Sequence, residues 1–145
     1  MDVTIDEVVD SDDSVIVDLV RLIAQLSSQP SESVEELTRE SISSPHARVL
    51  VARVGGVIVG TLTLVLFTIP SGRRAWIEDV VVDKDSRRTG VGEELVNAAV
   101  ALARESGART VDLTSRASRT EAHRLYEKVG FQTRDTNVYR IALGG

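Results

Sequence analysis

The sequence predicts one α/β domain over residues 1–145, with a mixed, mostly antiparallel sheet flanked by about four helices. Two β-branched runs, 47–54 and 57–67, flank Gly55-Gly56, a pattern typical of a β-hairpin. A strand-like run at 75–82, a helical pattern at 90–105 and another strand-like run at 111–115 indicate a crossover between parallel strands. The length of 145 residues suits one hydrophobic core, and no stretch is typical of an interdomain linker.

The N-terminal part is expected to form one strand and two helices. Residues 3–9 predict the first strand. Residues 10–26 begin with acidic side chains suited to helix capping, and apolar residues then recur at helical spacing, at Val15, Leu19, Leu22, Ile23 and Leu26. A break at Gln29-Pro30 precedes a second predicted helix, 31–40, with Ser31 as its candidate cap.

The second half is expected to add three strands and two helices. Residues 75–82 are largely consecutive apolar residues, which indicates a strand buried on both faces. The predicted helices 90–105 and 120–128 are followed by Gly107 and Gly130 as stop signals. Residues 111–115 predict a short strand, and T-N-V-Y-R-I-A-L at 136–143 predicts a closing strand. The edge of that last strand could mediate a homodimer.

The composition argues against several kinds of site and partner. Without cysteine there is no disulfide, thiol nucleophile or thiolate metal site, and two distant histidines do not predict a metal site. A net charge of -5 and 3% aromatic residues argue against nucleic-acid binding. No apolar run approaches the roughly 18 residues of a membrane span, and the acidic first residues do not look like a targeting peptide. We therefore expect a cytoplasmic protein.

The loop at 83–92 has the features of an anion-binding site. A helix is predicted to begin here, and helix N-termini carry unpaired N–H groups and partial positive charge. Gly90 and Gly92 allow close approach to the backbone, and Arg87 and Arg88 add cationic donors. A tight turn without a ligand is the alternative. No Lys-Ser/Thr pair follows the glycines, and Leu95 replaces the third glycine of a dinucleotide-binding loop.

Two segments together resemble the GNAT superfamily of acyl-CoA-dependent N-acyltransferases. Val82, Arg87, Gly90 and Gly92 are spaced as in its acyl-CoA pyrophosphate loop, V-x-x-x-x-R-x-x-G-x-G. Residues 119–131, R-T-E-A-H-R-L-Y-E-K-V-G-F, are similar to its helix ending in L-Y-E-K-x-G-F. The order of elements fits over essentially the whole chain. The resemblance implies a GNAT-type fold in which two parallel strands splay apart.

The resemblance also implies where acetyl-CoA would bind. The splay would lie between 76–82 and 111–115, with pantetheine in the gap and paired with the main chain of residues 80–82. The pyrophosphate would be held by the Arg87 side chain and by backbone N–H groups along the loop. The residues assigned to the cosubstrate are Val80, Val81, Val82, Arg87, Arg88, Thr89, Gly90, Val91, Gly92, Arg119 and Tyr126.

Tyr126 matches the tyrosine that in this family often sits by the cofactor sulfur. A phenol with a pKa of about 10 can give its proton to a departing thiolate. The alternative is that Tyr126 only packs between helix and sheet. Arg119 occupies a position where the family often has Asn, and it could meet a CoA phosphate or be solvated. His123, one turn before Tyr126, is expected at the surface.

Glu78 and Asp79 are the candidate acids for the acceptor amine. Neighbouring strand residues point to opposite faces, which would place Glu78 on the face of Val80 and Val82. A bulge would transfer the role to Asp79. In the family, a carboxylate here can take a proton from the incoming ammonium, and I-E-D-V-V-V resembles the glucosamine-phosphate branch. The alternative is a structural pair with Arg73, Arg74 or a backbone group.

We therefore expect an N-acetyltransferase that moves an acetyl group from acetyl-CoA to a primary amine by direct attack, without a metal. No covalent enzyme intermediate is expected, because the chain has no cysteine and no evident Ser/His pair. The catalytic residues would be Tyr126 and Glu78, with Asp79 at the substrate. The acceptor, a small molecule or a peptide amine, stays open. A non-catalytic acyl-CoA-binding or sensory domain is the alternative function.

Overall fold

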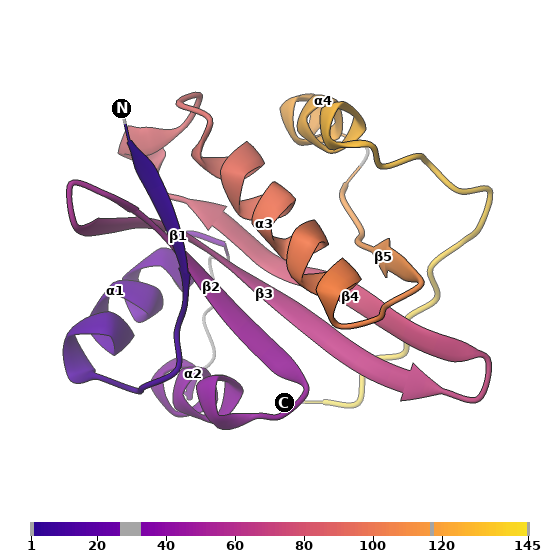
Figure 1. Cartoon of the computed structure of the whole chain (residues 1–145), viewed down its shortest axis with the longest axis horizontal. Helices are drawn as coiled ribbons and strands as arrows, with labels where there is room; N and C mark the ends of the chain where they lie inside the picture. Colours follow the sequence, from indigo (N-terminus) through magenta and orange to yellow (C-terminus); the bar gives the residue numbers. More distant parts are fainter. Residues whose placement is uncertain (1, 27–32, 117, 145) are drawn as a thin grey trace.

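The computed structural model describes residues 2–26, 33–116 and 118–144 (Figure 1). The predicted cap Ser31 lies outside these ranges. In chain order the elements are β1 (Val3–Glu7), α1 (Asp13–Ile23), α2 (Val34–Ser43), β2 (Ala47–Val54), β3 (Val57–Ile69), β4 (Gly72–Val82), the 3-10 turn η1 (Lys84–Ser86), α3 (Val91–Glu105), β5 (Thr110–Asp112) and α4 (Thr120–Val129).

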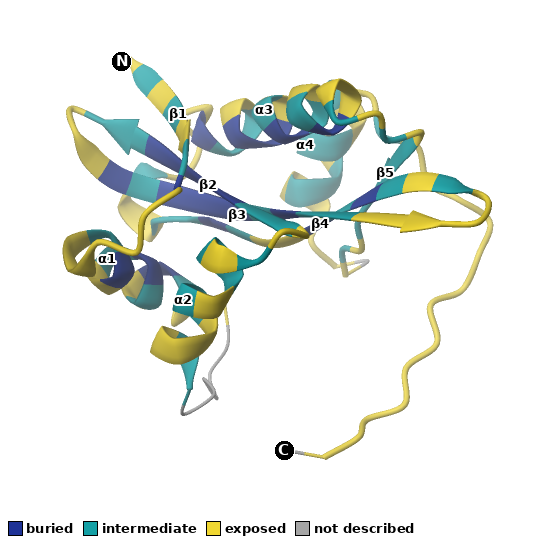
Figure 2. Cartoon of the chain, turned by 60° about the horizontal axis from the view of Figure 1, so that its bottom comes forward, coloured by how far each residue is buried: buried dark blue, intermediate teal, exposed yellow. Residues whose placement is uncertain are grey.

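The strands form a mixed sheet in the order β1-β2-β3-β4-β5. Neighbouring strands are antiparallel except β4 and β5, which are parallel. Helices α3 and α4 cover one face of the sheet, and α1 and α2 cover the other (Figure 2). This arrangement confirms the predicted α/β class with a mostly antiparallel sheet and one parallel pair.

Each face of the sheet has its own hydrophobic core. On the α3 side, Leu95 and Ala99 are buried in one cluster with Leu62 of β3. On the α1 side, Leu19 and Leu22 are buried in another cluster with residues of the middle strands. Burying each such large side chain contributes about 1.5–3 kcal/mol. The apolar stripe predicted for α1 is only partly right, because α1 ends at Ile23 and Leu26 is left exposed.

The predicted closing strand at 136–143 is wrong. No strand forms within residues 131–144, and Tyr139, Ile141 and Leu143 are 90%, 83% and 93% exposed. Figure 2 shows this part of the chain leading away from the sheet. The β-branched and aromatic residues give the segment strand propensity, but a strand forms only when a partner edge is paired to it. Consequently β5 is the last strand, and its outer edge has no strand neighbour among the described residues.

No helix in the described part of the chain is long and apolar enough to cross a membrane. The predicted strand at 111–115 is shorter than expected and includes only Thr110–Asp112. The predicted strand at 75–82 is longer, because β4 begins at Gly72.

Candidate active site

The parallel strands β4 and β5 separate soon after they begin to pair. Their register includes only Arg74 to Trp76 of β4 and Thr110 to Asp112 of β5. Beyond Trp76, β4 continues to Val82 beside β3, while the chain after Asp112 turns toward α4. The resulting gap lies where the sequence predicts the splay, and it leaves one edge of β4 unpaired from 77 to 82 among the described residues.

A β-bulge interrupts β4 at the acidic pair. Thr63 pairs with Glu78 and Thr61 pairs with Val81, so β4 has one more residue than β3 between these two pairs. The extra residue changes the alternation of side chains along the strand. Asp79 lies in this interval with a φ of 52°, a left-handed conformation that Asp tolerates better than most residues.

The bulge reverses the predicted alternation of side chains between the two faces of the sheet after Asp79. Val80 and Val82 pack against the core on the α3 side, together with Ile77. Val81 belongs to the core on the α1 side, and Glu78 precedes the bulge on that same face, because it lies opposite Thr63. The expectation that Glu78 shares a face with Val80 and Val82 is therefore wrong, since an extra residue shifts the alternation by one.

The environment of Asp79 changes its acidity. Burial raises the pKa of the Asp79 carboxyl group above its ordinary value. Asp79 is nevertheless an exposed residue, so solvent limits the effect of burial on its carboxyl group. Desolvation disfavours the charged form, which is why the pKa rises. Neither acid forms an ion pair with Arg73 or Arg74, so the structural pairing considered as an alternative is not seen in the described residues.

Tyr126 lies on α4 and is half-buried against the α3 core. Its ring meets Phe131 edge to face, with centroids 5.9 Å apart and an interplanar angle of 68°. Burial raises the pKa of the Tyr126 phenol, and the nearby positive charge of Arg119 opposes that shift. The phenol is therefore protonated at neutral pH and can act as a proton donor. Arg119 immediately precedes α4.

The loop after β4 is held by its own hydrogen bonds. Arg87 Nε donates to the Val82 carbonyl oxygen at 3.3 Å, and the Thr89 hydroxyl donates to the Ser86 carbonyl oxygen. Arg88 has a φ of 66° and pairs with Glu121 of α4 at 2.6 Å. Because Glu121 already pairs with the Arg88 guanidinium, the backbone of Arg88 is better placed than its side chain to meet an anion.

The two loop glycines serve different purposes. Gly90 precedes α3 with a φ of 88°, and a Cβ atom there would meet nothing within 4 Å. A Cβ atom at Gly92 would lie 3.0 Å from Leu125 Cδ1 and 3.6 Å from Val82 Cγ2. Only Gly90 therefore opens space beside the backbone, whereas Gly92 allows the end of β4, the start of α3 and α4 to meet. That both glycines let a ligand approach the backbone stays a prediction, and for Gly92 the contact with Leu125 gives a second reason for the missing Cβ.

The first turn of α3 supplies the backbone donors of this site. Its first helical hydrogen bond runs from Glu94 N to the Gly90 carbonyl oxygen, at 3.1 Å. The N–H groups of Val91, Gly92 and Glu93 precede that bond and have no intrahelical acceptor. They are therefore available to an anion, as the sequence predicts.

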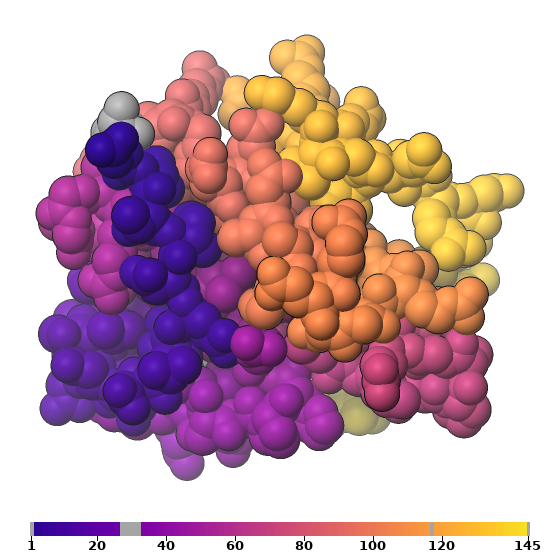
Figure 3. All heavy atoms as spheres, viewed as in Figure 1, coloured from indigo at the N-terminus to yellow at the C-terminus, as the bar shows by residue number. Residues whose placement is uncertain are grey.

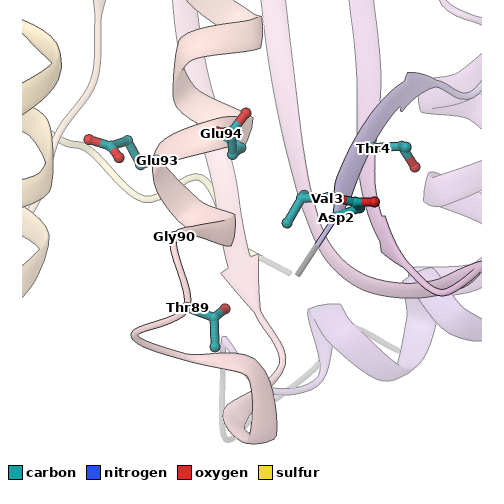
Figure 4. A pocket seen from close by; sticks show the side chains of 7 residues that line it. All are labelled: Asp2, Val3, Thr4, Thr89, Gly90, Glu93 and Glu94. Carbon is teal, nitrogen blue, oxygen red and sulfur yellow. The ribbon is translucent and has the colours of Figure 1, made fainter.

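A separate pocket lies between β1 and the start of α3 (Figure 4). Its volume is about 480 Å³, and it is lined by Asp2, Val3, Thr4, Thr89, Gly90, Glu93 and Glu94. Glu93 pairs with Lys128 at 3.1 Å and points away from β1. The carboxylates of Asp2 and Glu94 disfavour a phosphate on the β1 side of this pocket, because they repel anions.

Sequence reasoning missed three features of the region. The hydroxyl groups of Thr110 and Ser115, in β5 and after it, are buried without a hydrogen-bond partner in the described part of the chain. Arg21 of α1 pairs with Asp83 at 2.7 Å and so ties α1 to the loop. His123 Nε2 donates to the Arg116 carbonyl oxygen at 2.8 Å, which gives it a structural contact. The pair of Arg21 with Asp83 joins segments 62 residues apart, so it has no local sequence signal.

No group of His, Cys, Asp and Glu side chains in the described ranges is arranged to hold a metal ion. The site is instead built from a strand edge, a helix N-terminus, an acidic bulge and a protonated phenol. These groups can bind an extended ligand with an anionic part and can move protons at its far end.

Residues 17–131 match the family model described as the acetyltransferase (GNAT) family. The chain therefore belongs to the GNAT acetyltransferase family. Its class is that of an N-acetyltransferase, a transferase that modifies amines.

Solved structures share this fold. A transcriptional regulator from Bacillus halodurans C-125 is 25% identical, with a TM-score of 0.81 over 97% of this chain and 100% of that one. Glucosamine-6-phosphate N-acetyltransferase from Arabidopsis thaliana is 21% identical, with a TM-score of 0.79 over 97% and 99%. AAC(6')-Iy in complex with a CoA bisubstrate analogue is 16% identical, with a TM-score of 0.84 over 98% and 99%.

Proposed function

We propose that this protein transfers the acetyl group of acetyl-CoA to a primary amine by direct attack of the amine on the thioester. The observation that carries the proposal is the gap between β4 and β5, which is flanked by the acidic bulge and by α4 with its protonated tyrosine. Membership of the GNAT family supports acetyl-CoA as the donor.

The residues at the gap fit the donor. Val80, Val81 and Val82 lie on the part of β4 that β5 does not pair, so the backbone groups that point to this edge, away from β3, would meet the amide groups of pantetheine. Gly90 leaves room beside the start of α3, where free N–H groups would hold the pyrophosphate with Arg87. Acetyl-CoA would supply the activated acyl group, and the protein would hold and orient it.

Asp79 is the better candidate for taking the proton of the incoming ammonium. Burial raises the pKa of the Asp79 carboxyl group, and a carboxylate with a raised pKa is a stronger base than an ordinary one. Glu78, its neighbour on the α1 side, would attract the cationic amine. This proposal transfers the role of base from Glu78 to Asp79, because the bulge breaks the alternation on which the prediction of Glu78 rested.

Tyr126 would protonate the departing thiolate of CoA. The raised pKa keeps the phenol protonated until the thiolate forms, and the nearby charge of Arg119 stabilises the phenolate that follows. Backbone N–H groups of the β4 edge would stabilise the oxyanion formed during attack.

A thiol-release assay over a panel of amines tests the proposal. The panel contains an aminoglycoside, glucosamine 6-phosphate, a peptide with a free N-terminus and a lysine peptide, because some similar structures carry names of amino-sugar and peptide acetyltransferases. We expect thiol release with one class of amine and a loss of about 10²-fold or more in Tyr126→Phe and Asp79→Asn.

Asp10→Asn is the matched control, because Asp10 is exposed and lies outside these elements. It should keep full activity. Binding of acetyl-CoA without thiol release for any amine would instead favour a non-catalytic acyl-CoA-binding domain.

A further inference from the structure

The face of the sheet opposite α3 carries apolar residues that belong to neither hydrophobic core. Ala75 and Ile77 are buried in the α3 core, so the alternation of β4 places Trp76 on the opposite face. Val65 lies opposite Trp76 in the register, and Phe67 follows two residues farther along β3. None of these three side chains is a member of either core. Figure 2 shows that α1 and α2 cover only one part of this face, and that the β3–β4 hairpin extends beyond them.

This apolar strip, defined as Val65, Phe67 and Trp76, begins beside the proposed reaction centre. Glu78 follows Trp76 by two residues on the same face, and Asp79 comes next, in the bulge. Helices α3 and α4 cover the other face. A donor held on that side and an acceptor bound on the strip would therefore meet at the gap between β4 and β5. The strip is a surface along which an acceptor can extend away from its amine.

The far end of the strip carries positive charge. Arg74 lies opposite Phe67 on this face, four residues before Glu78. Its Nη2 donates to the Ser71 hydroxyl at 3.2 Å, and Arg109 Nη1 donates to the Ser71 carbonyl oxygen at 3.2 Å. Two guanidinium groups are thereby held beside one residue of the β3–β4 turn. Figure 3 shows this turn, at the lower right, against the chain that joins α3 to β5.

Neither guanidinium has a counter-ion in the described part of the chain. Arg74 and Arg109 form no ion pair there. The Nε atom of Arg74 is buried and has no hydrogen-bond partner among the described residues. Like charges held this close repel each other, and a partly buried charge without a partner is unfavourable. A carboxylate or a phosphate group offsets both effects, and guanidinium groups bind such anions through paired hydrogen bonds.

The opposite end of the strip is negative. Asp112 lies opposite Trp76 in the register of β4 and β5, on the same face as Glu78. Together with Asp79, these carboxylates favour the cationic amine and disfavour an anion. The anionic group is thus confined to the end of the strip at Arg74. An acceptor that matches this face carries opposite charges at its two ends.

We propose that the acceptor is an amine with a remote carboxylate or phosphate group, and that Arg74 and Arg109 bind this anionic group. The inference rests on the proposed acetyl transfer. The ammonium group lies at the acids near the bulge, and the body of the acceptor packs on the strip. At about 3.3 Å per residue, Arg74 and Glu78 are roughly 13 Å apart along β4. Since both side chains reach toward the ligand, this spacing suits a molecule the size of a tripeptide or an amino-sugar phosphate.

A fluorescence titration tests the proposal without any acetyl transfer. Trp76 is the only tryptophan of the chain, so its emission reports on the strip. Two matched pairs of amines are compared, trialanine with trialanine amide and glucosamine 6-phosphate with glucosamine. We expect the anionic member of at least one pair to bind about tenfold more tightly than its partner, and that pair identifies the anion as carboxylate or phosphate. Equal affinity within both pairs, or no response of Trp76 to any of the four amines, would overturn the proposal.

Two variants test the assigned arginines. Arg74→Gln and Arg109→Gln should each remove most of the preference for the anionic amine and leave the affinity for its partner unchanged. Arg109 is exposed, so its variant provides the test if circular dichroism shows that Arg74→Gln is unfolded. The matched control is Arg124→Gln, because Arg124 is an exposed arginine on α4, which covers the other face of the sheet. This control should keep the full preference. Folded arginine variants that keep it as well would show that the anion binds elsewhere.

Thiol release separates this proposal from the proposed function. With an acceptor that reacts, Arg74→Gln should raise KM about tenfold and leave kcat nearly unchanged, because a contact remote from the thioester contributes to binding alone. A preference in binding without thiol release would contradict only the proposed function. Thiol release with equal kcat/KM for both members of each pair would contradict only the assignment of the anion site.

Discussion

Asp79 combines an unusual backbone conformation with an unfavourable environment for charge. Its φ of 52° is found where β4 gains a residue against β3, and burial raises the pKa of its carboxyl group. Strained residues and shifted pKa values tend to occur together at functional sites, because the surrounding fold has to hold them in place. For Asp79, the consequence can be measured as a dependence of stability on pH.

The variant Asp79→Asn should raise the melting temperature at pH 7. A carboxyl group whose folded pKa is raised adds stability below its unfolded pKa and loses it as the pH rises through the folded value. At neutral pH the charged form is therefore the costly one, and the amide removes that cost. Thermal unfolding at pH 7 and pH 3 checks this prediction. A gain of equal size at both pH values would show that the effect is not electrostatic.

The variant Tyr126→Phe should change the pH profile as well as the rate. If the phenol is the general acid, the wild-type rate falls at alkaline pH, as Tyr126 loses its proton at a pKa that burial raises. The variant should be slower, by about 10²-fold in kcat, and should lack this alkaline decrease. Rates from pH 7 upward, to a pH well above the ordinary phenol pKa of about 10, provide the measurement. An unchanged profile would limit Tyr126 to packing against Phe131.

Residue identities at the site were more predictable than residue orientations. Arg87, Gly90 and Tyr126 belong to short local patterns, so the sequence alone could place them at the loop and on α4. Which of Glu78 and Asp79 faces which side depends on the register between β4 and β3. The two strands belong to separate segments of the chain, so a bulge of one residue leaves no local signal.

At the scale of the element, the loop between β4 and α3 depends on two glycines with different constraints. Gly90 has a φ of 88°, which an alanine adopts only with strain, whereas Gly92 lies within α3 next to Leu125. We expect Gly90→Ala to lower the free energy of unfolding by about 1 kcal/mol. For Gly92→Ala we expect a change within about 0.5 kcal/mol, because helix propensity offsets a contact that the flexible end of Leu125 can relieve. Urea denaturation distinguishes them, and equal losses would contradict this explanation.

Elements defined by their own periodicity were predicted well, and elements defined by a distant partner were not. The hairpin of β2 and β3, and the helix α3, follow from alternation, glycines and helical spacing within a single stretch. Residues 136–143 have the same kind of alternation, yet they form no strand, because no strand pairs with them among the described residues. Alternation therefore identifies a segment that has the composition of a strand, but it does not predict which strand the segment would pair with.

At the scale of the whole molecule, binding of acetyl-CoA should stabilise the fold. The β4 edge and the loop are expected to bind it, and the ligand has no such site in the unfolded chain. At a concentration 100 times its Kd, linkage predicts about 2.7 kcal/mol of stabilisation. For a protein of this size this corresponds to a rise of roughly 5–10 °C in the melting temperature.

Arg87→Ala should reduce this rise. Arg104→Ala, an exposed arginine at the far end of α3, should keep it and serves as the control. Differential scanning fluorimetry with and without acetyl-CoA provides the comparison. If acetyl-CoA in large excess leaves the melting temperature unchanged, the chain does not bind it.

Two contacts attach the loop to the helix that carries Tyr126. Glu121 pairs with Arg88, and Leu125 packs at Gly92, four residues and about one turn farther along α4. Since both contacts lie on one side of α4, the loop and the helix are expected to move as one body. A ligand that fixes the loop thereby also fixes the phenol. Loosening this connection with Leu125→Ala should lower kcat while the affinity for acetyl-CoA stays unchanged, so turnover and binding become separable at a residue to which no substrate contact is assigned.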